Sequence, residues 1–296
     1  MTLTKKRILC ALGVLVLLAA AVLLLWKGTH RAEHAAETTA QTSQPLTLSE
    51  LLCATGHGRT VSSEEFDFFY DMVKRDSANR GDAAALTEET QTFIREQSAM
   101  LCAGELAGLC EPYSFESLRQ NMETENEKRA EMKASGEVFY GLERFDLESY
   151  YSYITSNLRL DLLTYFVEQA TDEMQEEGRQ YYEDHLSDYQ TIETASYIQE
   201  KNGEEEEKSL TFSDMRSLMN TNEELFEFLL SAQPGDRLTQ TGQDGEQTVF
   251  TFQSLEMLTA SFEEAYNVAM QDYIANEKYD DILNTVSKNN PVIFEK

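Results

Sequence analysis

The sequence begins with an apolar stretch that restricts where this end of the chain can lie. From Ile8 to Trp26, nineteen successive residues carry no charged or strongly polar side chain. As an α-helix rising about 1.5 Å per residue, the stretch is about 28 Å long, close to the roughly 30 Å hydrocarbon core of a bilayer. A buried core helix is a poor alternative for so long an apolar run at a terminus. We therefore predict a transmembrane helix within residues 1–31.

Two features favour an uncleaved signal anchor over a cleaved signal peptide. The apolar stretch is longer than the core of a typical signal peptide, and Trp26 leads directly into Lys27 without a small-residue cleavage site. Residues 5–7, Lys-Lys-Arg, outweigh Lys27 and Arg31, which favours a cytoplasmic amino terminus. We predict a single-pass protein of the cell membrane whose body lies on the extracytoplasmic side. Whether the anchor is cleaved stays open.

Net charge divides sharply between this terminus and the rest of the chain. The whole sequence has a formal charge of −29, from 24 Lys and Arg and 53 Asp and Glu. Residues 1–31 hold five of the basic side chains and no acidic one, so the other 265 residues carry a net charge of −34. A body this acidic excludes a general nucleic-acid binder, which needs basic side chains to displace phosphate counterions. It also disfavours a body lying flat on an anionic lipid surface.

The sequence beyond the anchor predicts long helices. Residues 32–46 are mostly Ala, Glu, Thr, Gln and Ser, which indicates a polar tether. With 14 Gly, 4 Pro and 41% hydrophobic residues, the remainder can form helices around at least one sizeable core. Apolar residues at helical spacing predict helices at 48–53, from 62 or 63 onward, and at 87–110, 114–134, 146–170, 171–185, 222–230 and 261–287.

Strand signals begin after Asp188 and are short. The Asn202-Gly203 pair is a strong turn signal, and alternating β-branched and aromatic residues predict strands at 191–199, 210–212, 248–252 and 291–294. We therefore predict an α+β fold that is mostly α. It consists of a helical N-terminal lobe at 47–187, a small strand-rich insert at 188–258, and a C-terminal helix and strand at 259–296 that complete the lobe.

No residue pattern points to a metal or a cofactor, and we predict neither. The acidic run Glu204–Glu207 lacks the spaced acids and central Gly of a calcium loop, so we interpret it as a solvated turn. Cys102 and Cys110 lie on one predicted helix, about 12 Å apart by helical rise and too far for a disulfide. We interpret these two and Cys53 as free thiols buried at small apolar sites, while a pairing of Cys53 with either one stays open.

Short segments of distinctive composition follow one another along the body. They are GRTVSSEEF at 58–66, NEKR at 126–129, GEVFYG at 136–141, YYSY at 150–153, GRQYYEDH at 178–185, ASYI at 195–198, FEEA at 262–265, KYDDI at 278–282 and PV at 291–292. In this order they resemble the SurA/PrsA-like family of exported chaperones, which carry a parvulin-type peptidyl-prolyl isomerase domain. The resemblance covers roughly residues 47–296.

The resemblance implies a helical chaperone lobe, a parvulin-like insert and polypeptide clients. It also implies a catalytic histidine in the Ala-Ser-x-Ile strand, where this sequence has Tyr197. Residues 188–296 contain no His and no Cys. The insert of about seventy residues is also short for the family and lacks its Gly-Asp-Leu-Gly-like segment. Prolyl isomerisation is therefore not expected from the family's residues, and we lean towards a protein that is not an enzyme.

We predict a membrane-anchored extracytoplasmic chaperone-like protein that binds unfolded or secreted polypeptides. The candidate client-binding residues are Phe68, Phe69, Tyr70, Tyr150 and Tyr153, of which Phe68 and Tyr153 fall off the apolar stripes of their helices. Two alternatives stay open, namely an isomerase that uses other residues and a structural partner of an envelope complex. The oligomeric state stays open as well.

Overall fold

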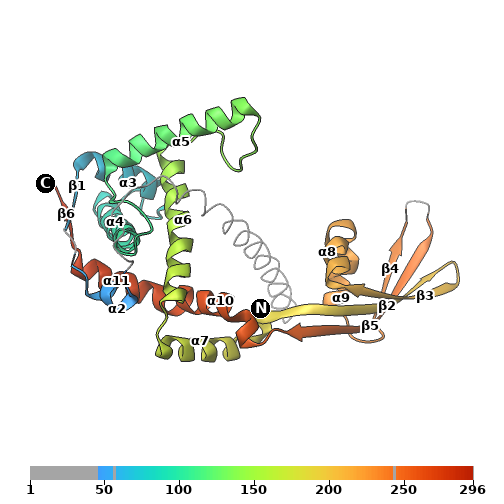
Figure 1. Cartoon of the computed structure of the whole chain (residues 1–296). Coiled ribbons are helices and arrows are strands. Elements are labelled where there is room, and N and C mark those ends of the chain that lie inside the picture. The colour runs from blue at the N-terminus through green and yellow to red at the C-terminus, as the bar shows by residue number, and fades with distance from the viewer. Residues whose placement is uncertain (1–45, 56–57, 243–244, 296) are drawn as a thin grey trace. The chain divides into compact units, whose positions relative to one another are not determined.

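The computed structural model describes residues 46–55, 58–242 and 245–295 (Figure 1). The predicted membrane anchor, residues 1–31, and the predicted tether up to residue 45 lie outside this range. Among the helices of the described range, none has both the length and the apolarity that crossing a bilayer requires. The described chain is mostly helical with a small antiparallel sheet, which confirms the predicted α+β class.

The chain divides into two compact units. The helical unit comprises Gln41–Glu176 and Met270–Lys296, and the sheet unit contains Glu177–Ala269. Each unit has a hydrophobic cluster of its own. We describe the two units separately.

Two helices, α7 (Asp172–Asp184) and α10 (Phe262–Tyr273), cross the boundaries between the units. On the sheet-unit side, the ring centroids of Tyr182 and Phe262 lie 5.5 Å apart, and the Tyr182 hydroxyl donates a hydrogen bond to the carbonyl of Ala260. These contacts tie the two helix ends to the sheet unit. The units therefore divide outside the limits 188 and 258 that we drew from the sequence.

In the helical unit, the main helices begin where the sequence places a capping residue. The side chains of Thr47, Ser62, Asp82, Ser114 and Asp146 each accept a backbone amide hydrogen bond from the first helical turn, which stabilises the helix start. The elements are α2 (Leu48–Cys53), β1 (Arg59–Val61), α3 (Ser63–Asp76), α4 (Ala83–Leu106), α5 (Phe115–Ser135), α6 (Leu147–Glu168), the π-helical segment η2 (Ile274–Lys278), α11 (Tyr279–Asn289) and β6 (Val292–Phe294).

Segments from both ends of the chain close the helical unit. Strands β1 and β6 pair in parallel, with Arg59 opposite Val292, and they lie side by side at one edge of the unit (Figure 1). Helix α11 packs on α4 and α2, and the side-chain amide of Asn289 donates a hydrogen bond to the carbonyl of Leu52 at 2.8 Å. The N-terminal and C-terminal segments therefore build one packed unit.

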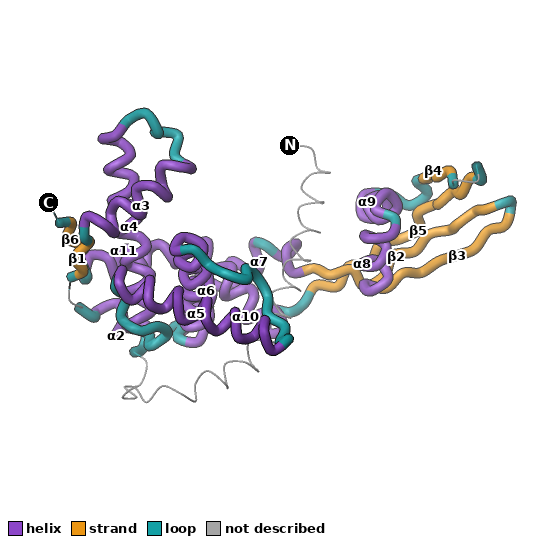
Figure 2. Tube along the Cα trace, turned by 90° about the horizontal axis from the view of Figure 1, so that it is seen from above, coloured by secondary structure: helices purple, strands orange, loops and turns teal. Residues whose placement is uncertain are grey.

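The sheet unit is a four-stranded antiparallel sheet with two helices on one face (Figure 2). The strand order is β3-β2-β5-β4. Residues from α8 and α9 pack against Tyr197, Phe250 and Phe252 of the sheet to form its core. The elements are the 3₁₀ turn η1 (Leu186–Tyr189), β2 (Gln190–Lys201), β3 (Glu204–Thr211), α8 (Phe212–Thr221), α9 (Glu223–Ser231), β4 (Arg237–Thr241) and β5 (Gln247–Thr259).

The interpretation of Glu204–Glu207 as a turn was wrong, because these residues belong to β3. Asn202 and Gly203 have φ values of 55° and 80°, so they make the two-residue turn alone, and Lys201 pairs with Glu204 directly after it. Strand β3 lies at the edge of the sheet, where charged side chains are tolerated and oppose pairing with other chains. Elements β1, β4 and α8 were not predicted from the sequence.

Two predicted helices differ from the structure at an irregularity of the backbone. The predicted 87–110 helix is α4, which ends at Leu106, because Gly108 adopts a φ of 68° and the amide of Leu109 bonds back to the carbonyl of Gly104 at 2.8 Å. The predicted 261–287 helix is interrupted by the π-helical segment between α10 and α11. In both cases an irregularity of the backbone, rather than a change in the spacing of apolar residues, determines where the regular α-helix stops.

The end of α4 also changes the placement of the cysteines. Cys110 lies in the turn after α4, where its Sγ atom is 3.8 Å from the carbonyl oxygen of Leu101, so it does not lie on the helix that carries Cys102. All three described cysteines are free, and Cys53 is exposed rather than buried as we expected. Burial raises the pKa of the Cys102 and Cys110 thiols to about 11, so both are protonated at neutral pH.

Candidate functional site

The structure does not bring the five sequence-predicted aromatic residues together on one surface. Phe69 and Tyr150 are buried, and Phe68 is half-buried in the same cluster, where its ring lies 5.5 Å from that of Phe115. Tyr70 is half-buried beside Phe66. Of the five, Tyr153 alone is exposed, with 41% of its surface accessible.

Tyr153 borders a loop that is organised by one buried arginine. Arg129 of α5 is 6% exposed, and its guanidinium carbon lies 4.5 Å, 5.4 Å and 5.6 Å from the ring centroids of Phe145, Phe139 and Tyr153. Such contacts place the cation against the electron-rich faces of the rings, which stabilises it in a site with little water. The arginine thereby orders aromatic residues from both sides of the loop.

The polar atoms of Arg129 are matched just as fully. Its Nη1 atom donates to the carbonyls of Leu142 at 2.7 Å and Tyr140 at 3.2 Å, and its Nε atom donates to Glu125 at 2.8 Å. A buried charge is costly unless it is paired and hydrogen-bonded, and here it is both. Because two of the acceptors are loop carbonyls, the compensation of this charge requires the loop to hold one conformation.

A second buried side chain of α5 fixes the far end of the loop. Asn126 is 8% exposed, its Nδ2 atom donates to the carbonyl of Phe145 at 2.9 Å, and the amide of Phe145 donates to its Oδ1 atom at 2.7 Å. Gly136 and Gly141, with φ values of 77° and 90°, supply the left-handed positions that the loop needs. Asn126 and Arg129 of α5 therefore anchor the loop instead of facing solvent.

The loop held in this way presents large apolar side chains to solvent. Val138 is 77% exposed, Tyr140 76% and Leu142 52%. We call Val138, Tyr140, Leu142 and Tyr153 the loop surface. Phe139, between two of these residues, points inward to Arg129. Exposed apolar residues on a fixed backbone are typical of binding surfaces rather than of solvated loops.

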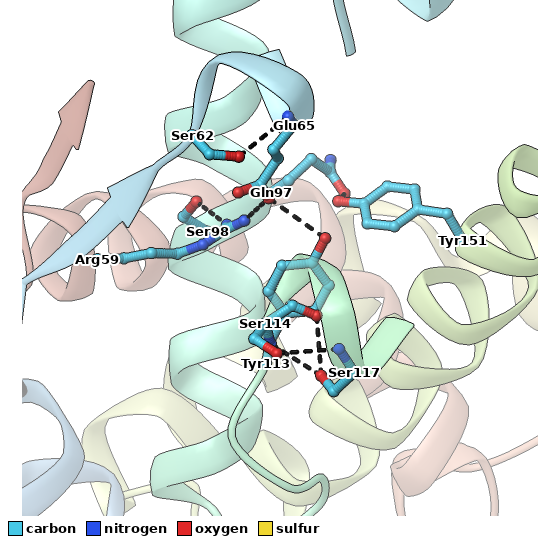
Figure 3. A network of polar contacts seen from close by, with 9 residues as sticks. All are labelled: Arg59, Ser62, Glu65, Gln97, Ser98, Tyr113, Ser114, Ser117 and Tyr151. Atoms are coloured by element: carbon cyan, nitrogen blue, oxygen red, sulfur yellow. Dashed lines mark hydrogen bonds and ion pairs between the residues drawn. The ribbon is translucent and has the colours of Figure 1, made fainter. Parts of the chain in front are cut away.

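A second polar network lies inside the helical unit and joins β1, α3 and α4 (Figure 3). Arg59 forms an ion pair with Glu65, which is 2% exposed, and also donates to the hydroxyl of Ser98. The Tyr113 hydroxyl donates to Glu65 at 3.3 Å, and the Arg59 guanidinium carbon lies 4.4 Å from the Tyr113 ring centroid. Burial lowers the pKa of Arg59 and raises that of Tyr113. This network fixes α3, the helix that carries Phe68 and Phe69, against β1 and α4.

The sheet unit offers no catalytic arrangement at the position that the resemblance indicated. Tyr197 is 6% exposed and packs with its ring centroid 5.7 Å from that of Phe250, inside the core. Burial raises the pKa of the Tyr197 hydroxyl. On the opposite face of the sheet, the hydroxyls of Ser196 and Ser254 bond to each other at 2.7 Å. Within the described residues, no three His, Cys, Asp or Glu side chains are placed to hold a metal ion.

Part of the loop surface could be predicted from the sequence, but not what holds it. Tyr153 was predicted because it falls off the apolar stripe of its helix, and residues 136–141 were noted as a segment of distinctive composition. Leu142 was missed. The signal that could have found the loop is an apolar run between two glycines that follows a helix with few apolar residues.

Solved structures with a distant likeness to this chain include two chaperone-type proteins. No family model matches the chain, and no curated protein matches it. A SurA-like chaperone of Campylobacter jejuni superposes with a TM-score of 0.31 and 11% sequence identity, over 75% of this chain and 90% of that one. The foldase protein PrsA from Streptococcus pneumoniae superposes with a TM-score of 0.28 and 12% identity, over 76% of this chain and 88% of that one. Both likenesses are too distant to bear on the site.

Proposed function

We propose that this protein binds unfolded polypeptide segments in a chaperone-like manner, through the loop surface of its helical unit. The observation that carries the proposal is the loop itself, in which Val138, Tyr140 and Leu142 are held in the open by the buried Arg129. Binding of a segment there costs the protein little conformational entropy, because the loop is already ordered in the free protein.

The proposal includes the compartment and the absence of turnover. Residues 1–31 would anchor the protein in the cell membrane, with the acidic body on the extracytoplasmic side. In favour of this placement are the apolar stretch and the basic residues before it. Proteolysis of intact spheroplasts should then remove the body, and its survival until the membrane is opened would contradict the orientation.

The test of binding is suppression of aggregation by the full chain held in lipid nanodiscs. Several unfolded clients should aggregate at least threefold more slowly at a severalfold molar excess of the protein. The triple variant Val138→Ser, Tyr140→Ser, Leu142→Ser should lose most of this effect. No suppression by the natural chain would sink the proposal.

A matched control separates the loop from exposed apolar surface in general. Leu160, Met257 and Leu258 are exposed to 54%, 43% and 56% and lie outside the loop. Their triple replacement by Ser removes a similar number of apolar side chains, and we expect it to leave suppression within a factor of two. Equal loss in both triple variants would show that the loop has no special role.

The alternative of prolyl isomerisation is separated by a rate measurement. The uncatalysed rate for a proline-containing tetrapeptide should be unchanged by the protein, because Tyr197 is buried and residues 188–296 contain no His or Cys. An acceleration that follows the protein concentration would favour the isomerase instead. Co-purification with one stoichiometric envelope protein, without clients, would favour a structural role.

A further inference from the structure

The helical unit contains a cavity of about 760 Å³ that is separate from the loop surface. It is bordered by the second half of α3, the first half of α4 and the first turns of α6. Its size lies within the range of ligand sites, which is roughly 300–1,000 Å³. We call it the acidic groove, and it is lined by Met72, Val73, Asp76, Ser77, Asn79, Ala85, Glu88, Glu89, Thr92, Phe93, Glu96, Glu148 and Ser152.

The lining combines an apolar part with carboxylates and contains no basic side chain. The apolar part is Met72, Val73 and Phe93. Met72 and Phe93 also pack against the aromatic core of the helical unit. The five carboxylates are Asp76, Glu88, Glu89, Glu96 and Glu148. A cavity of this composition is complementary to a ligand in which an aliphatic chain carries a positive charge.

Three of the five carboxylates already have partners, and the charge of Asp76 interacts with that of Arg75. Glu89 accepts a hydrogen bond from the Ser77 hydroxyl at 2.6 Å, and Glu148 forms an ion pair with Arg75 at the edge of α3. Within the described residues, the carboxylates of Glu88 and Glu96 take part in no hydrogen bond or ion pair. Both lie on α4 with Thr92 between them at intervals of four residues, so they share one helix face. Two carboxylates are therefore open to a ligand.

The ligand that these observations favour is an organic cation rather than a metal ion. No three acidic side chains of the described residues are close enough to coordinate a metal, so the carboxylates are spread along the groove. Lys and Arg side chains combine an aliphatic stem with a charged end, and they bury the stem against apolar surface while the charge stays hydrated or paired. The apolar lining and the separated carboxylates fit these two parts.

We propose that the acidic groove is a second polypeptide-binding site, which takes a Lys or Arg side chain together with a neighbouring apolar residue. This inference rests on the proposed function, because it names the kind of segment that the protein would select. The occupant is chosen by charge, since the groove has carboxylates and no basic side chain, in a body with a net charge of −34.

The groove and the loop surface share one helix. Glu148 and Ser152 of α6 line the groove, and the adjacent Tyr153 belongs to the loop surface. A client segment with basic residues close to aromatic or aliphatic ones offers a suitable side chain to each of the two sites. Clients with this pattern should bind more tightly than clients with only one of the two features.

The experiment uses two fluorescent peptides with the same Leu and Phe residues, in which Lys at every third position is replaced by Gln in the second peptide. Binding to the full chain in nanodiscs is measured by anisotropy. The Lys peptide should bind at least fivefold more tightly at low salt, and the difference should shrink as ionic strength rises. The variant Glu88→Gln, Glu96→Gln should abolish most of the difference while leaving the Gln peptide unaffected.

A control of equal charge change distinguishes the groove from the general acidity of the body. Glu123 and Glu127 of α5 are exposed and lie outside the groove, so Glu123→Gln, Glu127→Gln should leave both affinities within a factor of two. An equal loss in both double variants would overturn the groove as a site, and so would equal binding of the two peptides. If neither peptide binds, the proposed function fails as well, whereas binding of both without preference refutes only the groove.

Discussion

The helical unit and the sheet unit are built on opposite principles in their interiors. Within the described residues, the buried polar and charged residues apart from tyrosines all belong to the helical unit: Glu65, Ser77, Thr90, Ser98, Asn126, Arg129, Thr155 and Asn290. The core of the sheet unit consists of apolar and aromatic residues alone, with Tyr197 the one hydroxyl-bearing member of its cluster. Both units nevertheless have well-packed cores.

This difference bears on where binding can occur. An apolar core holds a backbone together without specifying loops at its edge, whereas a buried charge is stable only when each of its partners is in place. Arg129 uses this requirement to hold an apolar loop in the open. Among the described residues of the sheet unit there is no such device, and its open face shows hydroxyls and the Arg237–Glu200 ion pair. The proposed binding therefore belongs to the helical unit.

The strongest test of the comparison is to break the buried ion pair of the helical unit. Arg59→Met leaves the carboxylate of Glu65 buried without its cation, which should cost about 3–5 kcal/mol. Hydrogen exchange followed by mass spectrometry reports each unit separately, and protection should fall in the helical unit. In Arg59→Met, Glu65→Leu no buried charge remains, so much of the loss should be recovered. A loss below about 1 kcal/mol would contradict the view that this pair holds the helices.

The sheet unit should respond instead to a change of volume. Leu229 of α9 is fully buried in its core, and Leu229→Ala should cost about 3 kcal/mol through lost burial and the cavity left behind. The neighbouring Leu230 is half-buried and serves as the control, with an expected cost of about 1 kcal/mol for Leu230→Ala. Exchange should rise in the sheet unit in both cases. Equal costs for the two variants would show that the core is not centred on Leu229.

These two units also differ in how far the sequence predicted them. Local signals were sufficient where one turn decides the outcome, as in the helix predicted at 48–53 and the Asn202-Gly203 turn, both of which the structure confirms. They were insufficient where distant residues decide it. Strand β3 contains four successive Glu residues and forms because β2 pairs with it, not because of its own composition.

The candidate site illustrates the same limit. Phe68 and Tyr153 both fall off the apolar stripes of their helices, yet Phe115 of α5 covers Phe68 while Tyr153 stays exposed. The spacing within one helix cannot tell these cases apart, because the covering residue comes from another element. The polar face of α5 was equally misleading, since Asn126 and Arg129 look solvated in sequence and are buried under the loop.

A smaller effect should follow from a change that keeps the buried charge of Arg129 and removes its shape. Arg129→Lys keeps a cation but cannot reach Glu125 and the two loop carbonyls at once, because Lys lacks the planar fork of donors. We expect a loss of about 2 kcal/mol, the scale of a hydrogen bond to a charged group. Exchange should rise at residues 137–145, and suppression of aggregation should weaken. The control Lys128→Arg, at an exposed neighbouring position, should change neither. Unchanged exchange in the loop would refute the role of the arginine.

The smallest effect is one that should not distinguish the units at all. Asp146 caps α6 in the helical unit and Thr211 caps α8 in the sheet unit, so Asp146→Ala and Thr211→Ala should each cost about 1 kcal/mol. Hydrogen bonds from Ser149 lower the pKa of Asp146, and those from Thr211 lower the pKa of Asp214. A carboxyl whose pKa is lower in the fold stabilises the fold above its ordinary pKa and loses that contribution as the pH falls through the folded value. The loss of unfolding free energy should therefore be smaller at pH 3 than at pH 7 for both variants. Hydrogen exchange in the unit that carries the variant measures this loss. A cost confined to one unit would show that the helix starts of the other unit depend on the core and not on the cap, which would make helix capping a further difference between the two units.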